Sequence, residues 1–150
     1  MTPSIRDEST AKALTSESSP LLDGLCLLIV DDDPDTRCLF ALALEEDGAE
    51  VIVAASADEA LNVVEQHQPD VVVSDILMPY VTGYDLIRQV KDLDARRGKQ
   101  TLAIAVTALA GYEERTRALE AGFSGYLPKP VNIDNLSAIV AILAGRAIAV

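Results

Sequence analysis

Several residue types are scarce in this 150-residue chain. It has no Trp, one His and two Cys, and aromatic side chains make up 4% of the sequence. The two cysteines, Cys26 and Cys38, form neither a CxxC pair nor a disulfide framework, so we expect two buried reduced thiols. Hydrophobic residues nevertheless reach 49%, which predicts one domain of ordinary size with an aliphatic core. The single histidine, His67, is expected at the surface.

Basic residues are scarce as well. Twelve Lys and Arg residues oppose 24 Asp and Glu residues, which gives a net charge of −12. Domains that bind nucleic acid carry a basic face, so this balance argues against nucleic-acid binding. No apolar run is long enough for a membrane span, and the N-terminus lacks the apolar core of a signal peptide. We therefore expect a cytoplasmic protein that binds neither nucleic acid nor membrane.

Two apolar runs end directly in carboxylates. The first precedes Asp31, Asp32 and Asp33, and the second, residues 71–74, ends at Asp75. If both runs are neighbouring parallel strands, these carboxylates share the crevice where open α/β sheets bind their ligands. Two carboxylates about 4 Å apart repel by roughly 4 kcal/mol at an effective dielectric constant near 20, so such a cluster indicates a bound cation. Oxygen ligands alone favour a hard ion such as Mg²⁺, with Mn²⁺ as the alternative.

Two later apolar runs end in other polar groups. Residues 101–106 lead into Thr107, and residues 125–127 lead through a proline into Lys129. Carboxylates, a hydroxyl and an ammonium at the ends of neighbouring strands together form a site for a phosphoryl group. In such a site Asp75 can be the attacking nucleophile.

Four motifs, in this order and each after an apolar run, resemble the receiver domain of bacterial two-component response regulators. The resemblance covers residues 24–145 and implies a signalling domain rather than an enzyme, one that catalyses only its own phosphorylation and dephosphorylation. The motifs are Val30-Asp31-Asp32-Asp33, Ser74-Asp75-Ile76-Leu77-Met78-Pro79 with Gly83, Val106-Thr107-Ala108, and Tyr126-Leu127-Pro128-Lys129-Pro130.

The resemblance implies a phosphoacceptor and a metal site. Asp75 is expected to accept the phosphoryl group and to be a metal ligand. Asp32 is the expected direct Mg²⁺ ligand, and Asp31 is expected to bind the ion directly or through water. The backbone carbonyl of Leu77 is the usual third protein ligand in this family.

The resemblance also implies residues that bind and report the phosphoryl group. Lys129 is expected to pair with it, and the Thr107 hydroxyl is expected to donate a hydrogen bond to one of its oxygens. Thr107 and Tyr126 form the expected conformational switch. Leu77 and Leu109 occupy positions that in relatives help to set how fast water attacks the acyl phosphate, so two leucines are expected to shield it.

Partners follow from the same resemblance. A sensor histidine kinase or a histidine phosphotransfer protein is expected to donate the phosphoryl group, and an unknown downstream protein is expected to read the result. The reading face is expected over residues 113–121, 125–127 and 133–143, and it can also support a homodimer.

Alternatives to this interpretation differ in how well they fit. A calcium loop starting at Asp31 fails, because Thr36 and Leu42 stand where Gly and Glu are required. A metal-dependent small-molecule phosphatase would need a second acid–base group near Asp75, and the sequence offers none. A stand-alone response regulator and the receiver module of a hybrid sensor histidine kinase both remain. No output domain is expected after the last helix.

The fold class follows from five alternating strand and helix patterns, which predict an α/β domain with a parallel, doubly wound sheet. The resemblance selects the flavodoxin-like strand order 2-1-3-4-5 with helices on both faces. Residues 1–22 are expected to be a disordered arm or linker, 23–145 the receiver domain and 146–150 a short tail. The expected strands are 25–30, 51–53, 70–75, 102–106 and 125–127, and the expected helices are 34–46, 84–93, 113–121, 133–143 and one that ends before Pro69.

Helix starts are marked by residue type. Pro34 stands where proline is tolerated in a first helical turn, and Ser56 with Glu59 has the spacing of a capping box. Asp33 and Asp35 are expected in the first turn after Asp32, where the helix dipole favours carboxylates. The helix at 34–46 is expected to bury Leu39, Phe40, Ala43 and Leu44.

Overall fold

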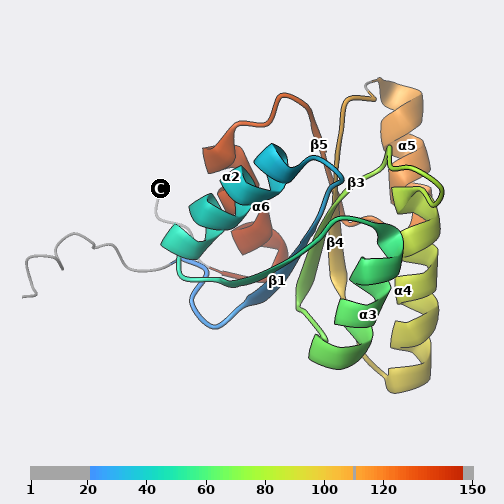
Figure 1. Cartoon of the computed structure of the whole chain (residues 1–150), viewed down its shortest axis with the longest axis horizontal. Coiled ribbons are helices and arrows are strands. Elements are labelled where there is room, and N and C mark those ends of the chain that lie inside the picture. The colour runs from blue at the N-terminus through green and yellow to red at the C-terminus, as the bar shows by residue number, and fades with distance from the viewer. Residues whose placement is uncertain (1–20, 110, 147–150) are drawn as a thin grey trace, which may run out of the picture.

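The computed structural model describes residues 21–109 and 111–146. Within them five parallel strands form one sheet in the order β2-β1-β3-β4-β5, which confirms the predicted flavodoxin-like topology (Figure 1). The elements are β1 (Cys26–Val30), α2 (Pro34–Glu46), β2 (Glu50–Ala54), α3 (Ala57–His67), β3 (Val71–Asp75), α4 (Gly83–Arg97), β4 (Leu102–Thr107), α5 (Tyr112–Ala121), β5 (Gly125–Pro128) and α6 (Ile133–Leu143).

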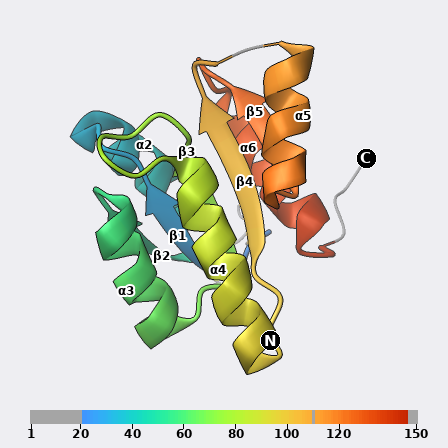
Figure 2. The ribbon, with the colours of Figure 1, turned by 90° about the vertical axis from the view of Figure 1, so that its right-hand side faces the viewer.

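Helices cover both faces of the sheet. Helices α2 and α6 lie on one face, and α3, α4 and α5 lie on the other (Figures 1 and 2). Side chains alternate along a strand, so Leu27 and Ile29 of β1 pack under α2 and α6 while Leu28 and Val30 pack under the opposite helices. A strand covered on both sides is apolar throughout, which explains why the central strands are continuous apolar runs.

The helices that follow β1 and β2 begin at the positions that the sequence predicted. Asp33 caps α2, because its side chain accepts hydrogen bonds from the Asp35 amide and the Thr36 hydroxyl, and Pro34 is the first helical residue. The Ser56 hydroxyl accepts a hydrogen bond from the Glu59 amide at 3.2 Å and caps α3. Only three residues, 31–33, separate β1 from α2, which fixes the acidic segment at the edge of the sheet.

Helix α4 is longer than predicted. It was expected to end near Leu93, but it continues to Arg97 and stops at Gly98, whose φ is +67°. The added turn is held from outside the helix. The buried Asp94 carboxylate accepts hydrogen bonds from the Thr101 amide at 2.7 Å and the Thr101 hydroxyl at 2.8 Å. This contact joins the helix to the residue that precedes β4. The sequence around Asp94 is polar, and no local pattern in it predicts the contact.

The expected burial of both cysteines was wrong, and so was that of Leu39. Cys38 is exposed, Cys26 is partly exposed, and the Leu39 side chain is 54% exposed. Helix α2 turns a narrow stripe with Phe40 and Leu44 toward the sheet. Residues next to that stripe in sequence point outward, because successive helical positions are 100° apart.

The described structure includes residues 21 and 22, which precede the predicted start of the domain at residue 23. Leu22, assigned to the arm, is fully buried, and its amide donates to the Asp47 carbonyl at 2.8 Å. Residues 1–20 of the predicted arm and 147–150 of the predicted tail lie outside the described residues. No helix in the described part of the chain has the length and apolarity to cross a membrane.

Candidate functional site

Three carboxylates meet at the carboxyl ends of β1 and β3. The two strands pair in parallel with Val30 opposite Ser74, so the residues that follow them, Asp31 and Asp75, are neighbours. One oxygen from each of Asp31, Asp32 and Asp75 lies within 4.8 Å of the others. Asp31 and Asp75 are buried, at 2% and 6% exposed, whereas Asp32 is exposed. The strand order thus brings together the carboxylates that the sequence singled out.

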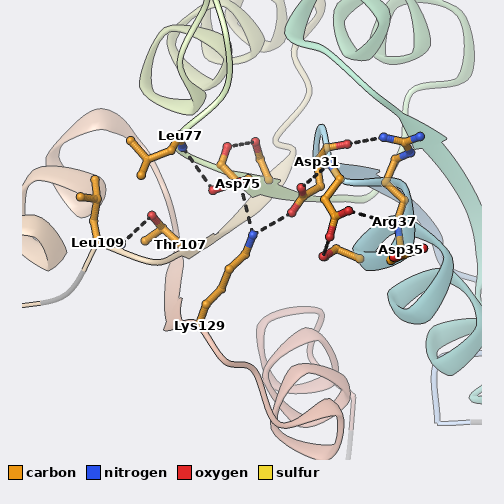
Figure 3. Close-up of polar contacts among 11 residues, drawn as sticks. Asp31, Asp35, Arg37, Asp75, Leu77, Thr107, Leu109 and Lys129 are labelled. Atoms are coloured by element: carbon orange, nitrogen blue, oxygen red, sulfur yellow. Dashed lines mark hydrogen bonds and ion pairs between the residues drawn. The ribbon is translucent and has the colours of Figure 1, made fainter.

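Lys129 reaches this cluster from the end of β5. Its Nζ donates to Asp31 Oδ2 at 3.0 Å and to Asp75 Oδ2 at 3.3 Å (Figure 3). Burial alone lowers the Lys129 pKa, but the hydrogen bond to Asp31 and the charges of both carboxylates outweigh it, so the pKa is raised. Lys129 therefore remains a cation throughout the neutral range.

The Asp75 carboxyl is held in a partly desolvated position. Burial raises the pKa of Asp75, and the charge of Asp31 raises it further, while Lys129 and the Leu77 amide lower it. The Leu77 amide donates to Asp75 Oδ1 at 3.2 Å, and the Leu77 side chain is 49% exposed. Asp75 is thus a carboxylate whose negative charge the apoprotein stabilises only partly.

Gly83 allows the loop after Asp75 to close tightly. A Cβ at this position would lie 2.5 Å from the Asp75 carbonyl oxygen and 2.8 Å from Ile76 Cα, both of which are backbone atoms. The Gly83 amide also donates to the Ile76 carbonyl at 2.9 Å. The start of α4 is therefore packed directly against the end of β3, which explains the glycine in the motif.

Thr107 and Tyr126 both contact Leu109. Thr107 is fully buried at the end of β4, and its hydroxyl oxygen accepts a hydrogen bond from the Leu109 amide at 3.1 Å. The Tyr126 phenol donates to the Leu109 carbonyl. A displacement of Thr107 would therefore move the residue that holds the Tyr126 phenol.

One residue near the cluster was missed by the sequence analysis. Arg37, in the first turns of α2, donates from Nη1 to the backbone carbonyl of Asp31 at 2.7 Å. The Asp33 amide donates to Asp31 Oδ1 at 2.9 Å on the other side of the same segment. The available signal was the isolation of this arginine in a strongly acidic part of the sequence.

The residues present fit a divalent cation. The donors at the cluster are carboxylate oxygens, the type that Mg²⁺ and Mn²⁺ prefer. Three carboxylates opposed by the Lys129 ammonium leave two net negative charges, which a divalent ion would balance. Such an ion would also stabilise the Asp75 carboxylate, whose pKa burial raises.

Comparison with known proteins decides the family. The sequence matches the family model described as the response regulator receiver domain over residues 27–141. The chain belongs to the response regulator receiver domain family. Receiver domains are signalling domains of two-component systems that bind Mg²⁺ at an acidic pocket, and they interact with histidine kinases or phosphotransfer proteins.

Individual relatives differ in length. The receiver domain is 48% identical over 106 residues to an uncharacterized 14.6 kDa protein in the sodA1 3′ region of Leptolyngbya boryana, covering 71% of this chain and 79% of that protein. It is 36% identical over 138 residues to the sensor histidine kinase RcsC of Salmonella typhi, covering 92% of this chain but only 14% of that protein. The solved Francisella response regulator 1452 receiver domain matches with a TM-score of 0.73 and 31% identity, covering 81% and 98% of the two chains.

Proposed function

We propose that this receiver domain accepts a phosphoryl group from a phosphohistidine onto Asp75, with a Mg²⁺ or Mn²⁺ ion at the acidic cluster. The observation that carries the proposal is the position of Asp75. It lies at the end of β3, within 4.8 Å of carboxylate oxygens from Asp31 and Asp32 and 3.3 Å from the Lys129 ammonium. A carboxylate nucleophile beside a cation site and a fixed ammonium is an arrangement suited to phosphoryl transfer.

Each side chain has a role in this step. An Asp75 carboxylate oxygen attacks phosphorus, the bond from phosphorus to the histidine nitrogen breaks, and its electron pair returns to the imidazole. Lys129, protonated because its pKa is raised, neutralises charge on the phosphoryl oxygens. The Thr107 hydroxyl donates to another of these oxygens.

The cation would be held by the ligands inferred from the sequence. Asp32, Asp75 and the Leu77 carbonyl would bind it, and Asp31 would bind it directly or through water. When bound, the ion supplies positive charge to the phosphoryl oxygens as the new bond forms. The product is an acyl phosphate on Asp75.

Phosphorylation is read through the contacts of Leu109. The phosphoryl group draws Thr107 toward Asp75, and the Leu109 segment moves with the Thr107 hydroxyl. The Tyr126 phenol then loses its acceptor on Leu109 and the ring turns inward. This change shifts the population toward a second conformation of the α5–β5–α6 face, where a downstream protein or a second receiver domain binds.

A groove beside the site suits the phosphodonor. It has a volume of about 460 Å³, and Lys129, which pairs with Asp31 and Asp75, is one of its lining residues. The exposed side chain of Leu39 lines this groove, and Leu42, three residues further along α2, is also exposed. We propose that the helix carrying the phosphohistidine lies along α2 and places its histidine beside Asp75. The lining residues are Thr36, Leu39, Phe40, Lys129, Pro130 and Val131.

The cellular setting has two candidates. The main proposal is a cytoplasmic response regulator that acts by protein contact, supported by the likeness to a small 14.6 kDa protein of which this chain covers 79%. The second candidate is the receiver module of a hybrid kinase, favoured by the likeness to RcsC over 92% of this chain. In both, the receiver domain extends from the core residue Leu22 to about residue 145.

The decisive experiment is phosphorylation in vitro. Acetyl phosphate with Mg²⁺ should raise the intact mass of the wild-type protein by one phosphoryl group and leave Asp75→Ala unmodified. Asp92→Ala is the matched control, because Asp92 is an exposed carboxylate on α4, and it should be modified like the wild type. Full modification of Asp75→Ala, or none of the wild type, would refute the proposal.

A further inference from the structure

Arg37 stands alone in an acidic part of the sequence. Residues 21–84 contain fourteen Asp and Glu residues and a single Lys or Arg side chain, which is Arg37. The next basic residue along the chain is Arg88. The fold places this isolated positive charge within one hydrogen bond of the Asp31 backbone, at the edge of the acidic cluster (Figure 3).

The contact that Arg37 makes is with backbone rather than with a carboxylate. Its Nη1 donates to the Asp31 carbonyl at 2.7 Å. Among the described residues, the ion pairs of the acidic cluster within 4.0 Å are made by Lys129. The guanidinium therefore leaves the carboxylate oxygens of Asp31 and Asp32 available to a cation.

The peptide group that Arg37 holds joins Asp31 to Asp32. The preceding peptide is also fixed, because the Asp31 amide donates to the Ala54 carbonyl of β2 at 3.2 Å. The Asp33 amide donates to Asp31 Oδ1 at 2.9 Å. With these contacts in place, the backbone of both acidic residues has one orientation, and so the directions of their carboxylates relative to Asp75 are restricted.

We propose that Arg37 is a positioning residue of the cation site, which orients the Asp31–Asp32 peptide so that both carboxylates face Asp75. This inference rests on the proposed Mg²⁺ site. Groups that orient metal ligands without touching the metal typically contribute about tenfold or more to metal affinity.

Two effects of Arg37 on a bound cation oppose each other. Its positive charge repels Mg²⁺, and this long-range effect is screened by salt, with a Debye length of about 10 Å at 0.1 M and 3 Å at 1 M. Its hydrogen bond to Asp31 orders the ligands, and this short-range effect persists in salt. Affinity measured at low and at high salt therefore separates positioning from charge.

The test is Mg²⁺ titration of metal-free protein, followed by calorimetry or amide NMR shifts at low salt and at high salt. Arg37→Met should weaken binding by about tenfold at high salt, where only the loss of positioning remains, and by less at low salt, where removing the positive charge offsets part of that loss. Arg88→Met is the matched control, because Arg88 is exposed on α4 and pairs with Asp85 at 3.1 Å, and its affinity should equal that of the wild type. Arg37→Lys, which keeps a donor, should recover part of the affinity.

A second measurement does not need the metal. In metal-free protein, hydrogen exchange at the Asp31, Asp32 and Asp33 amides should be faster in Arg37→Met than in Arg88→Met. Unchanged or tighter Mg²⁺ binding by Arg37→Met at high salt, or unchanged exchange, would overturn the positioning role. If the wild type binds no Mg²⁺, the proposed function fails instead, and the exchange comparison still decides whether Arg37 orders this segment.

If Arg37→Met does not fold, both measurements are made on Arg37→Lys, which should show smaller changes in the same directions. Wild-type Mg²⁺ affinity and wild-type exchange in Arg37→Lys would then overturn the positioning role.

Discussion

The Lys129 ammonium lies 3.3 Å from Asp75 Oδ2 although their strands are not neighbours. Asp75 ends β3 and Lys129 follows β5, and β4 lies between them in the sheet. The lysine side chain therefore passes over the end of β4, where Thr107 stands, to reach the carboxylates. The pKa of Lys129 is raised in the folded protein. The stabilisation from this ion pair is therefore fully present at pH values below the ordinary lysine pKa, and it is lost as pH rises through the folded-state pKa of Lys129.

Asp75→Asn is expected to stabilise the metal-free protein at neutral pH. Burial raises the Asp75 pKa in the folded state, so the folded protein holds a proton there more tightly than the unfolded chain does. The free energy of unfolding of the wild type therefore falls as pH rises from the ordinary value of 3.8 through the folded-state pKa. The variant lacks this fall, so its gain in the free energy of unfolding over the wild type should be larger at pH 7 than at pH 4. Urea unfolding in EDTA at pH 4 and pH 7 measures it, and an equal gain at both pH values would contradict the argument.

Asp32→Asn is expected to weaken Mg²⁺ binding by at least about tenfold, because a charged oxygen ligand becomes neutral. Like-charge repulsion in the empty cluster also falls, so metal-free stability should rise. Asp35→Asn makes the same change at an exposed carboxylate in the first turn of α2 and serves as the control. Equal Mg²⁺ affinity of Asp32→Asn and Asp35→Asn in titration calorimetry would exclude Asp32 as a ligand.

The Thr107→Ala variant is expected to be phosphorylated on Asp75 but to lose the conformational change that follows phosphorylation. The Asp75 carboxylate remains in place, whereas the hydroxyl that contacts Leu109 is lost. Amide exchange or NMR shifts on addition of beryllofluoride should therefore change across residues 108–127 in the wild type and change little in the variant. Asp75→Ala, which cannot bind beryllofluoride covalently, gives the baseline. A full wild-type response in Thr107→Ala would show that coupling follows another route.

Leu77→Asn is expected to shorten the lifetime of the acyl phosphate several-fold. Leu77 lies beside Asp75 and Leu109 lies beside Thr107 (Figure 3), and an amide in place of an apolar side chain can orient an attacking water. Leu119→Asn is the control, since Leu119 on α5 is 45% exposed against 49% for Leu77. The decay of phosphorylated protein, followed by intact mass, measures both lifetimes. Indistinguishable decay would show that Leu77 does not shield the site.

Gly83→Ala is expected to destabilise the fold by about 2 kcal/mol or more. The new Cβ would meet the Asp75 carbonyl and Ile76 Cα, which are backbone atoms and cannot rotate away. Gly98→Ala is the comparison, because its Cβ would meet nothing within 4 Å and only its φ of +67° opposes the change, at about 1 kcal/mol. Chemical denaturation of both variants tests the order, and a smaller loss at Gly83 would contradict it.

The sequence pattern predicted a parallel, doubly wound sheet, and its resemblance to receiver domains supplied the strand order that makes Asp31 and Asp75 neighbours. Each apolar run is long enough for one strand, and the runs that precede Asp31, Asp75 and Thr107 end directly at a polar residue. In parallel strands those ends lie along one edge, so local pattern and topology together place the side chains. The helix starts at Pro34 and Ser56 were also predictable, because capping depends on residues within a few positions of each other.

Other features depended on contacts between distant segments. The outward direction of Leu39 follows from which stripe of α2 meets the sheet, and periodicity alone allows several stripes. The end of α4 depends on Asp94 meeting Thr101, and the role of Arg37 depends on where the Asp31 carbonyl points. Such contacts are made by single side chains across the fold, and only the tertiary structure decides them, because many partners of the same chemistry are available in the sequence.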